Sequence, residues 1–240
     1  MARPARVSPD RILVAAALEF AERGYAGARV DRIARRARVN KAMLYYHFKS
    51  KQGLYRALLR QIFTRAAERL RAIAASDRPP VEKIDRAIAG IAGFIREHAF
   101  FPAIMLREIA EGGVHLDRET LATLAAVPRA VGAIFEEGIA RHSFRPLHPL
   151  AAYFTMVAPL VVYHAGAPIR KELTTEHLVD DRALTPDAFV RHVQETMRRA
   201  LAYEPVAVPE TQRRVQVSRR SARPAPSGAA SNEESKTRTT

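Results

Sequence analysis

The residues whose types and spacing are best suited to chemistry in this sequence lie between positions 40 and 51. They offer an ammonium group, a small side chain, two phenol hydroxyls and an imidazole at Lys41, Ala42, Tyr45, Tyr46 and His47. If the stretch is helical, Leu44 and Phe48 share its buried side and the polar residues face solvent. Such a surface presents a positive charge and hydrogen-bond donors, which are the groups that bind the phosphates and base edges of nucleic acids.

Two short helices joined by a tight turn are the elements that would position these side chains. Apolar residues recur at i, i+3, i+4 and i+7 from Val30 to Ala37, which predicts a helix of about two turns. Asn40 then stands at the N-cap of a second helix, from Lys41 to about His47, where its side chain can accept from backbone N–H groups. This order matches a helix-turn-helix, whose second helix enters the major groove of DNA.

The stretch from Ile12 to Leu58 resembles the DNA-binding domain of the TetR (TetR/AcrR) family of bacterial transcriptional regulators. The resemblance rests on the octapeptide LYYHFKSK at residues 44–51, which follows an IAxxAxV turn at residues 33–39. It implies base-edge contacts for the first three of the following residues and phosphate contacts for the next three: Lys41, Ala42, Tyr45, Tyr46, His47 and Lys51. Arg29, near the start of the helix before the turn, would add a base or phosphate contact.

Three residues depart from the pattern of that family. Ala28 stands where a capping Thr is usual, Arg38 where the turn usually has Gly, and Met43 where a phosphate-binding Thr is common. If the turn requires a positive φ, Arg38 is strained there. The departures bear on individual phosphate contacts and leave the predicted fold unchanged.

Start and stop signals extend the helical prediction on both sides. Ser8-Pro9-Asp10 predicts a helix that runs to about Arg23 and ends at Gly24, which completes a three-helix head. Ser50 can cap a fourth helix of about 25 residues, long enough to link the head to a distant body. Gly53 occupies the position where a capping box has an acid, so this start lacks the usual reciprocal cap.

The rest of the chain shows helical patterns and no strand or internal repeat. Helices are predicted at about 80–98, 101–111, 117–142, 150–165 and 186–203. Pro128 is expected to divide or restart the third of these, and Pro159 to kink the fourth, which is nearly all apolar and expected to be buried. Residues 167–184 are expected to form a loop. The fold class is therefore all-α, with a three-helix head, a larger helical body and about nine helices.

The charge is distributed unevenly along the chain. Residues 1–60 hold 14 Lys and Arg against 4 Asp and Glu, residues 61–204 hold 18 against 18, and residues 205–240 hold 7 against 3. A basic end beside a neutral middle is typical of a phosphate-binding module joined to a domain with another task. We therefore expect a DNA-binding domain at residues 1–50, a ligand-binding and dimerisation domain at 51–204, and a disordered basic tail at 205–240.

Composition excludes several classes of protein. The chain has no cysteine, which excludes a disulfide framework and a Cys-based zinc site. No apolar run is long enough to span a bilayer, and the N-terminal residues lack the apolar stretch of a signal peptide. A soluble cytoplasmic protein without membrane contact is the expectation.

Aromatic and apolar residues of the body are candidates for a ligand site. Each of them alone is more often ordinary core, but the resemblance implies a ligand cavity between these helices. It also implies a four-helix dimer interface built from the last two predicted helices, 150–165 and 186–203, and their twofold mates. The candidate ligand-binding residues are Phe94, His98, Phe101, Met105, Phe135, Phe154 and Tyr163.

Motifs of common enzyme classes are not found in the sequence. It lacks HExxH, a Glu-x-x-His pair for a di-metal bundle, a phosphate-binding Gly loop and a nucleophile elbow. Glu108, Glu111 and His115 could share a helix face at i, i+3 and i+7, but Gly112-Gly113 is expected to disrupt that face. We therefore expect no metal site, no cofactor and no enzymatic activity.

These observations predict a ligand-responsive transcriptional repressor. It would bind a palindromic operator in double-stranded DNA as a homodimer and be released by a small, largely hydrophobic effector. Two rivals from other classes stay open: a DNA-compacting structural protein that uses its basic tail, and a helical enzyme with a DNA-binding head. A preference for one palindrome over random DNA separates the repressor from the compacting protein, whereas the enzyme requires a catalytic constellation.

Overall fold

The computed structural model describes residues 8–202, and these fold into ten helices with no strand among them. The helices are α1 (Pro9–Gly27), α2 (Val30–Ala37), α3 (Lys41–Phe48), α4 (Lys51–Ala74), α5 (Pro80–Glu97), α6 (Phe101–Ala110), α7 (Arg118–Ala140), α8 (Pro149–Ala165), α9 (Ala167–Thr175) and α10 (Pro186–Leu201). The all-α prediction is confirmed. The predicted loop at 167–184 is wrong in part, because α9 forms within it. The predicted tail at 205–240 lies outside the described residues.

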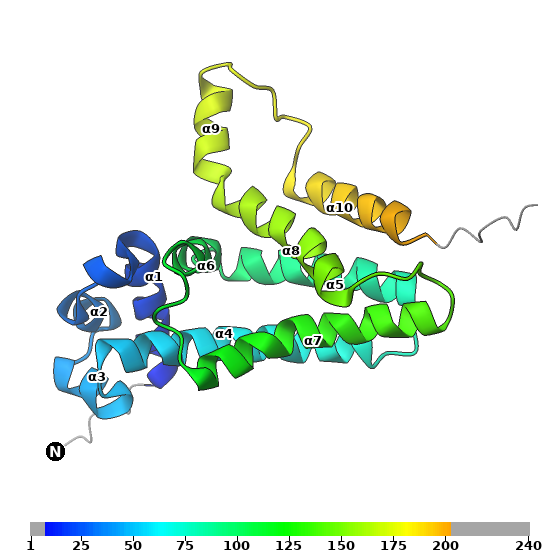
Figure 1. Cartoon of the computed structure of the whole chain (residues 1–240). Helices are drawn as coiled ribbons and strands as arrows, with labels where there is room; N and C mark the ends of the chain where they lie inside the picture. Colours follow the sequence, from blue (N-terminus) through cyan, green and yellow to red (C-terminus); the bar gives the residue numbers. More distant parts are fainter. Residues whose placement is uncertain (1–7, 203–240) are drawn as a thin grey trace, which may run out of the picture. The chain divides into compact units, whose positions relative to one another are not determined.

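Helices α1 to α3 form the head, at one end of the long helix α4 (Figure 1). Ser8 caps α1 by accepting a hydrogen bond from Asp10 N, and Gly24 interrupts that helix with φ 68° and ψ 175°. Asn40 caps α3 by accepting from Ala42 N at 3.0 Å. The turn before it places Arg38 at φ 52°, ψ 50°, the left-handed region in which a side chain is strained. These caps and the positive φ agree with the sequence predictions.

The start of α2 is stabilised by a residue of α1. Its N-cap, Arg29, makes no side-chain capping bond. Instead the Glu19 carboxylate, which is only 2% exposed, accepts from Arg29 N at 3.2 Å and from Arg32 Nε at 2.7 Å. The carboxylate thus satisfies one of the free N–H groups at the start of α2 and fixes Arg32 of that helix against α1.

Helix α4 connects the head to the body, which comprises α4 to α10. Ser50 caps it by accepting from Gly53 N at 2.9 Å. A Cβ on Gly53 would lie 2.1 Å from the carbonyl oxygen of Phe48, so the close approach of α3 excludes the acid of a capping box at this position. With 24 residues, α4 spans about 36 Å.

In the body, α7 packs along α4, and α5 and α8 complete the core (Figure 1). The expectation that Pro128 divides or restarts this helix is wrong, because α7 runs unbroken from Arg118 to Ala140. The proline removes one helical hydrogen bond, and the long packing surface against α4 offsets that loss. The expectation that the α8 segment is buried is also wrong in part, because Phe154 and Val162 are each 59% exposed.

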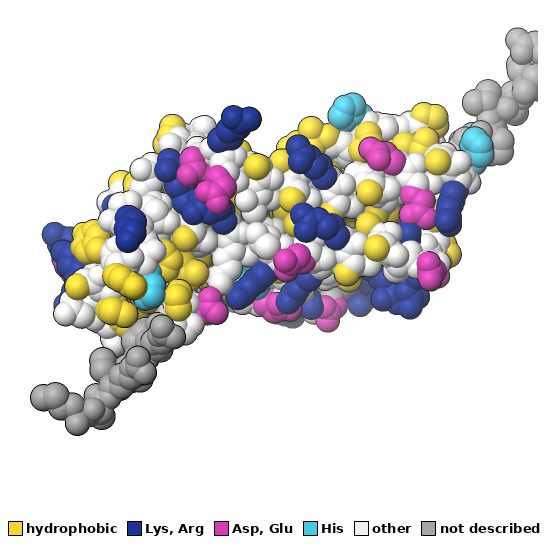
Figure 2. Space-filling model, turned by 90° about the horizontal axis from the view of Figure 1, so that it is seen from below, with side chains coloured by type: hydrophobic (Ala, Val, Ile, Leu, Met, Phe, Trp, Pro, Cys, Tyr) yellow, Lys and Arg dark blue, Asp and Glu magenta, His cyan; other side chains and the backbone are white. Residues whose placement is uncertain are grey.

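Figure 2 shows the molecule from below. On that side, Lys and Arg side chains of the body lie beside Asp and Glu side chains. Among the described residues, no single helix is both long and apolar enough to cross a membrane. The two helix pairs that would meet that test together, α5–α6 and α8–α9, are bent by 99° and 54°.

The strained turn before α3 provides a test of this fold. Arg38→Gly should raise the free energy of unfolding by about 1 kcal/mol, because the relief of the left-handed strain exceeds the added backbone entropy of glycine. Thermal or denaturant unfolding measures the change. Arg38→Ala is the matched control, since it removes the same side chain but keeps the Cβ. An equal change in both variants would show that the positive φ stores no strain.

Candidate nucleic-acid interface and ligand cavity

The exposed face of α3 presents the side chains that the sequence singled out. Leu44 is 2% exposed and anchors the helix, while Tyr45 and Tyr46 are 43% and 71% exposed. Lys41 and Ala42 are exposed beside them at the start of the helix. In Figure 2 hydrophobic side chains gather beside histidine at the end of the molecule that carries the head. The arrangement presents a cation, a small side chain and phenols on one short helix.

Lys41 is held by a carboxylate of the preceding helix. Its Nζ lies 2.7 Å from Asp31 Oδ1, and both side chains are exposed. The hydrogen bond and charge of Lys41 lower the pKa of Asp31, and those of Asp31 raise the pKa of Lys41. Because the pair is exposed to solvent, Lys41 can exchange this partner for an acceptor on a nucleic acid.

The other predicted DNA contacts differ in how they are placed. Arg29 is exposed at the start of α2. His47 is half-buried, and its Nε2 is buried without a hydrogen-bond partner among the described residues. Lys51 donates to the carbonyl oxygens of Ala26 and Ala28 and lies over the Tyr25 ring, so it connects α4 to the last turn of α1 and the residue after it. In this state its ammonium group binds protein acceptors.

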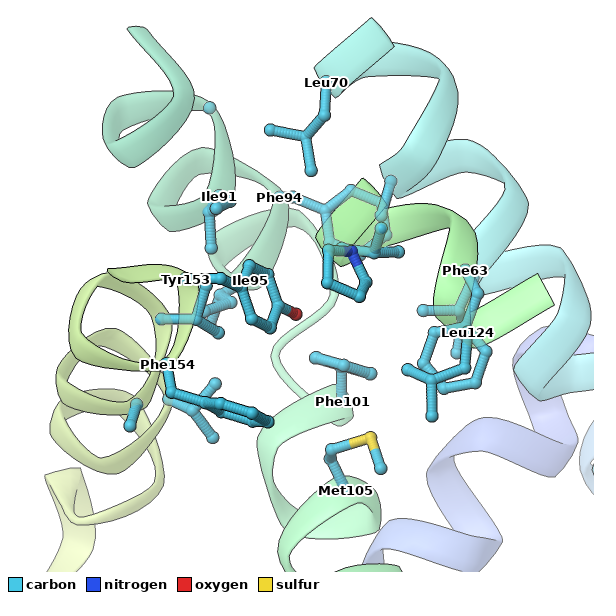
Figure 3. A pocket seen from close by; sticks show the side chains of 18 of the residues that line it. Phe63, Leu70, Ile91, Phe94, Ile95, Phe101, Met105, Leu124, Tyr153 and Phe154 are labelled. Atoms are coloured by element: carbon cyan, nitrogen blue, oxygen red, sulfur yellow. The ribbon is translucent and has the colours of Figure 1, made fainter. Parts of the chain in front are cut away.

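A cavity of about 560 Å³ lies between α4, α5, α6, α7 and α8 (Figure 3). This volume is within the range of small-molecule sites. Four of the residues predicted to bind a ligand line it: Phe94, Phe101, Met105 and Phe154. Phe101 packs edge-on against Phe63 of α4 and Phe94 of α5, so the aromatic side chains form one continuous wall.

The three remaining predicted ligand residues lie outside this lining. His98 stacks on Phe94, with ring centroids 4.2 Å apart, outside the lining. Phe135 is fully buried against Phe144 in the core of the body. Tyr163 stacks on Phe189 of α10 and donates its hydroxyl to Leu184 O at 2.7 Å. The sequence showed that these residues are aromatic, but it did not show which side of each helix they occupy.

The polar members of the lining were missed in the sequence. They are Tyr153 of α8 and Arg69 of α4. Arg69 Nη2 lies 2.5 Å from Glu97 Oε2, and the guanidinium is 5.5 Å from the centre of the Phe94 ring. The remaining lining is almost entirely aliphatic or aromatic, so the cavity favours an apolar molecule.

Helix α6 touches both the cavity and the head. Phe101 and Met105 line the cavity, and two residues later the Arg107 guanidinium donates to Phe20 O at 3.1 Å and to Ala21 O in α1. The next residue, Glu108, is 1% exposed and accepts from Tyr55 Oη at 2.8 Å. Burial and this hydrogen bond raise the pKa of Tyr55. One short helix therefore links the cavity wall to the end of α1.

Gly112-Gly113 interrupts the helix face as expected, since α6 ends at Ala110 and both glycines have positive φ, but Glu108, Glu111 and His115 still come together. The turn folds back, and ligand-type atoms of the three residues lie within 4.8 Å of one another. Hydrogen bonds account for the arrangement, since Glu108 accepts from the backbone N–H of His115 at 3.1 Å and lies 3.1 Å from its Nδ1. The His115 ring also packs on Tyr25 of α1. The cluster therefore joins α6 to the head.

Comparison with known proteins places these features in a family. Residues 12–58 match the family model described as bacterial regulatory proteins, tetR family. The chain is 30% identical to the HTH-type transcriptional repressor NicS of Pseudomonas putida over 161 residues, which cover 65% of the chain and 74% of NicS. It is 29% identical to the HTH-type transcriptional regulator RutR of Escherichia coli over 170 residues, covering 71% of the chain and 80% of RutR.

The fold is shared with solved structures as well. A putative TetR-family transcriptional regulator from Rhodococcus sp. superposes with a TM-score of 0.62 at 23% identity, covering 81% of this chain and 98% of that one. At 161 residues, the similarity to NicS is much longer than the head and extends into the body. The chain therefore belongs to the TetR family of bacterial regulatory proteins and is a DNA-binding transcriptional regulator.

Proposed function

We propose that this regulator is a repressor that binds a palindromic operator as a homodimer and is released when a small, largely hydrophobic effector occupies the cavity. The observation that carries the proposal is the position of α6. Its residues Phe101 and Met105 line the cavity, and Arg107 binds carbonyl groups of α1 in the head. A molecule that displaces α6 therefore acts on the head without touching DNA.

Operator binding is assigned to the exposed face of α3. Lys41, Ala42 and Tyr45 would meet base edges, since ammonium groups pair with guanine acceptors and apolar groups contact the thymine methyl. Tyr46, His47, Lys51 and Arg29 would bind phosphates or neighbouring bases. Lys51 would first have to leave the carbonyls of Ala26 and Ala28. Two α3 helices about 34 Å apart, one turn of B-DNA, would read the two halves of a palindrome.

We assign the surface that binds the second protomer to a stripe of exposed apolar residues on α8. Leu150, Phe154, Ala158 and Val162 recur every fourth residue and are all exposed. Ile169 of α9, 68% exposed, extends the apolar surface beyond the end of α8. An apolar surface of this kind is typical of a subunit interface. The apolar face of α10 packs within the chain, at Val190, Val193, Met197 and Leu201, so we assign most of the apolar interface to α8 and α9.

The energy needed for release is within reach of an apolar effector. Moving a 99:1 population fully to the other state requires about 5.5 kcal/mol of difference in binding, summed over both sites. Burying about 100 Å² more apolar surface in one state contributes about 2.5 kcal/mol per site. The apolar lining of the cavity can supply that difference.

Base readout by Tyr45 can be separated from phosphate contact. Tyr45→Ala should weaken binding to an operator selected from random duplexes by about 1–3 kcal/mol and weaken binding to random DNA much less. Fluorescence anisotropy with both duplexes measures the two losses. Tyr46→Ala is the matched control and should weaken both complexes alike, because a phosphate contact is independent of sequence. Equal losses on both duplexes for Tyr45→Ala would contradict base readout.

The dimer surface is tested by placing charges in the stripe at residues that do not line the cavity. Leu150→Glu and Ile169→Glu should convert the dimer to monomers at micromolar concentration, because both would bury a carboxylate at an apolar interface. Sedimentation velocity reports the change. Val14→Glu, at an apolar residue of α1 whose 59% exposure lies between those of Leu150 and Ile169, should leave the dimer intact. A wild-type protein that sediments as a monomer would rule out the assignment.

Two variants of α6 separate effector binding from release. With an effector found by screening metabolites against the operator complex, Phe101→Ala should weaken effector binding because it removes part of the cavity wall. Arg107→Ala should keep effector binding but lose the release of DNA, because it removes the contact with α1. Calorimetry measures effector binding, and anisotropy measures the release of DNA.

Linkage requires the operator to weaken effector binding by the factor by which the effector weakens operator binding. Equal effector affinity with and without operator would exclude this switch.

A further inference from the structure

The wall of the cavity contains one neutral polar group, the hydroxyl of Tyr153. Arg69, the only other polar side chain that residues 8–202 contribute to the lining, is half exposed and is bound by Glu97. The Tyr153 hydroxyl has no hydrogen-bond partner among the described residues, although its ring packs against Phe154. Figure 3 shows its oxygen directed away from α8, among the side chains of the other lining residues. The hydroxyl is therefore available to a molecule inside the cavity.

The hydroxyl can act there as a hydrogen-bond donor. Burial raises the pKa of Tyr153 to about 12, so the phenol keeps its proton at neutral pH. A donor enclosed by apolar side chains loses hydration, and it recovers that loss when an acceptor is bound beside it. Because the surrounding lining is apolar, a ligand that brings one acceptor and an apolar body matches the cavity better than a pure hydrocarbon.

We infer that Tyr153 determines the chemical class of the ligand, a neutral and largely apolar molecule whose single acceptor oxygen, such as a ketone, aldehyde or ester carbonyl, accepts a hydrogen bond from the Tyr153 hydroxyl. The inference rests on the proposed function, in which this cavity holds the effector. A carboxylate is disfavoured at the same place, because a buried charge needs a partner and the one cation in the lining is already paired with Glu97.

Two probes of nearly equal shape test the hydrogen bond in the full chain. The two probes are 2-acetylnaphthalene and 2-isopropylnaphthalene. The first carries a carbonyl oxygen on its substituent, and the second carries a methyl group in the corresponding place. Their affinities are measured by displacement of the fluorescent probe N-phenyl-1-naphthylamine from wild type and from Tyr153→Phe. The substitution should weaken binding of the ketone by about 3- to 10-fold, which corresponds to one neutral hydrogen bond. The affinity for the hydrocarbon should stay unchanged or rise slightly. 2-Naphthoate should bind wild type more weakly than the ketone.

Tyr163→Phe is the matched control. Its hydroxyl already donates to Leu184 O outside the cavity, so this variant should leave the affinities for both naphthalenes unchanged. A Tyr153→Phe variant that keeps the affinity for the ketone, or loses the same factor for both probes, would overturn the inference. So would tighter binding of 2-naphthoate than of the ketone. If the fluorescent probe binds neither wild type nor variant, the ligand-binding function itself fails, which is a distinct result.

Discussion

The Arg107 guanidinium at the interrupted end of α1 is a contact through which the cavity-lining part of the body reaches the head. Gly24 stops regular helical bonding, so carbonyl groups before it need donors from outside the helix. Arg107 supplies them at Phe20 and Ala21, and its side chain lies 3.6 Å from where a Cβ of Gly24 would be. The break in the first helix thus creates an acceptor site that a residue of the cavity-lining helix fills.

Much of the fold could be predicted because helix ends follow local rules. The N-caps at Ser8, Asn40 and Ser50 each accept a backbone hydrogen bond as their residue types indicate. The errors arise where distant parts of the chain decide. Pro128 stays inside α7 because that helix packs along α4, and Phe154 of the apolar α8 segment is 59% exposed because that side of the helix packs against no other described helix of the chain. No local pattern contains either fact.

The site was predictable to different degrees in its two parts. The face of α3 follows from one short motif, since adjacent tyrosines at 45 and 46 cannot both point inward, and both are exposed. The cavity depends on how five helices are rotated against one another, which aromatic content alone does not reveal. Phe135 and Phe154 look equivalent in the sequence, yet one is core and the other is a lining residue. Tyr153 was overlooked for the same reason.

Phe154, Ala158 and Val162 of α8 belong both to the cavity lining and to the exposed apolar stripe. A substitution at any of them changes the shape offered to the ligand and, at the same time, the shape offered to whatever covers the stripe. Ligand preference and surface recognition therefore cannot evolve independently along this helix. A lineage that acquires a new ligand through α8 has to adjust its partner surface as well, whereas changes in α5 or α7 alter the cavity without that constraint.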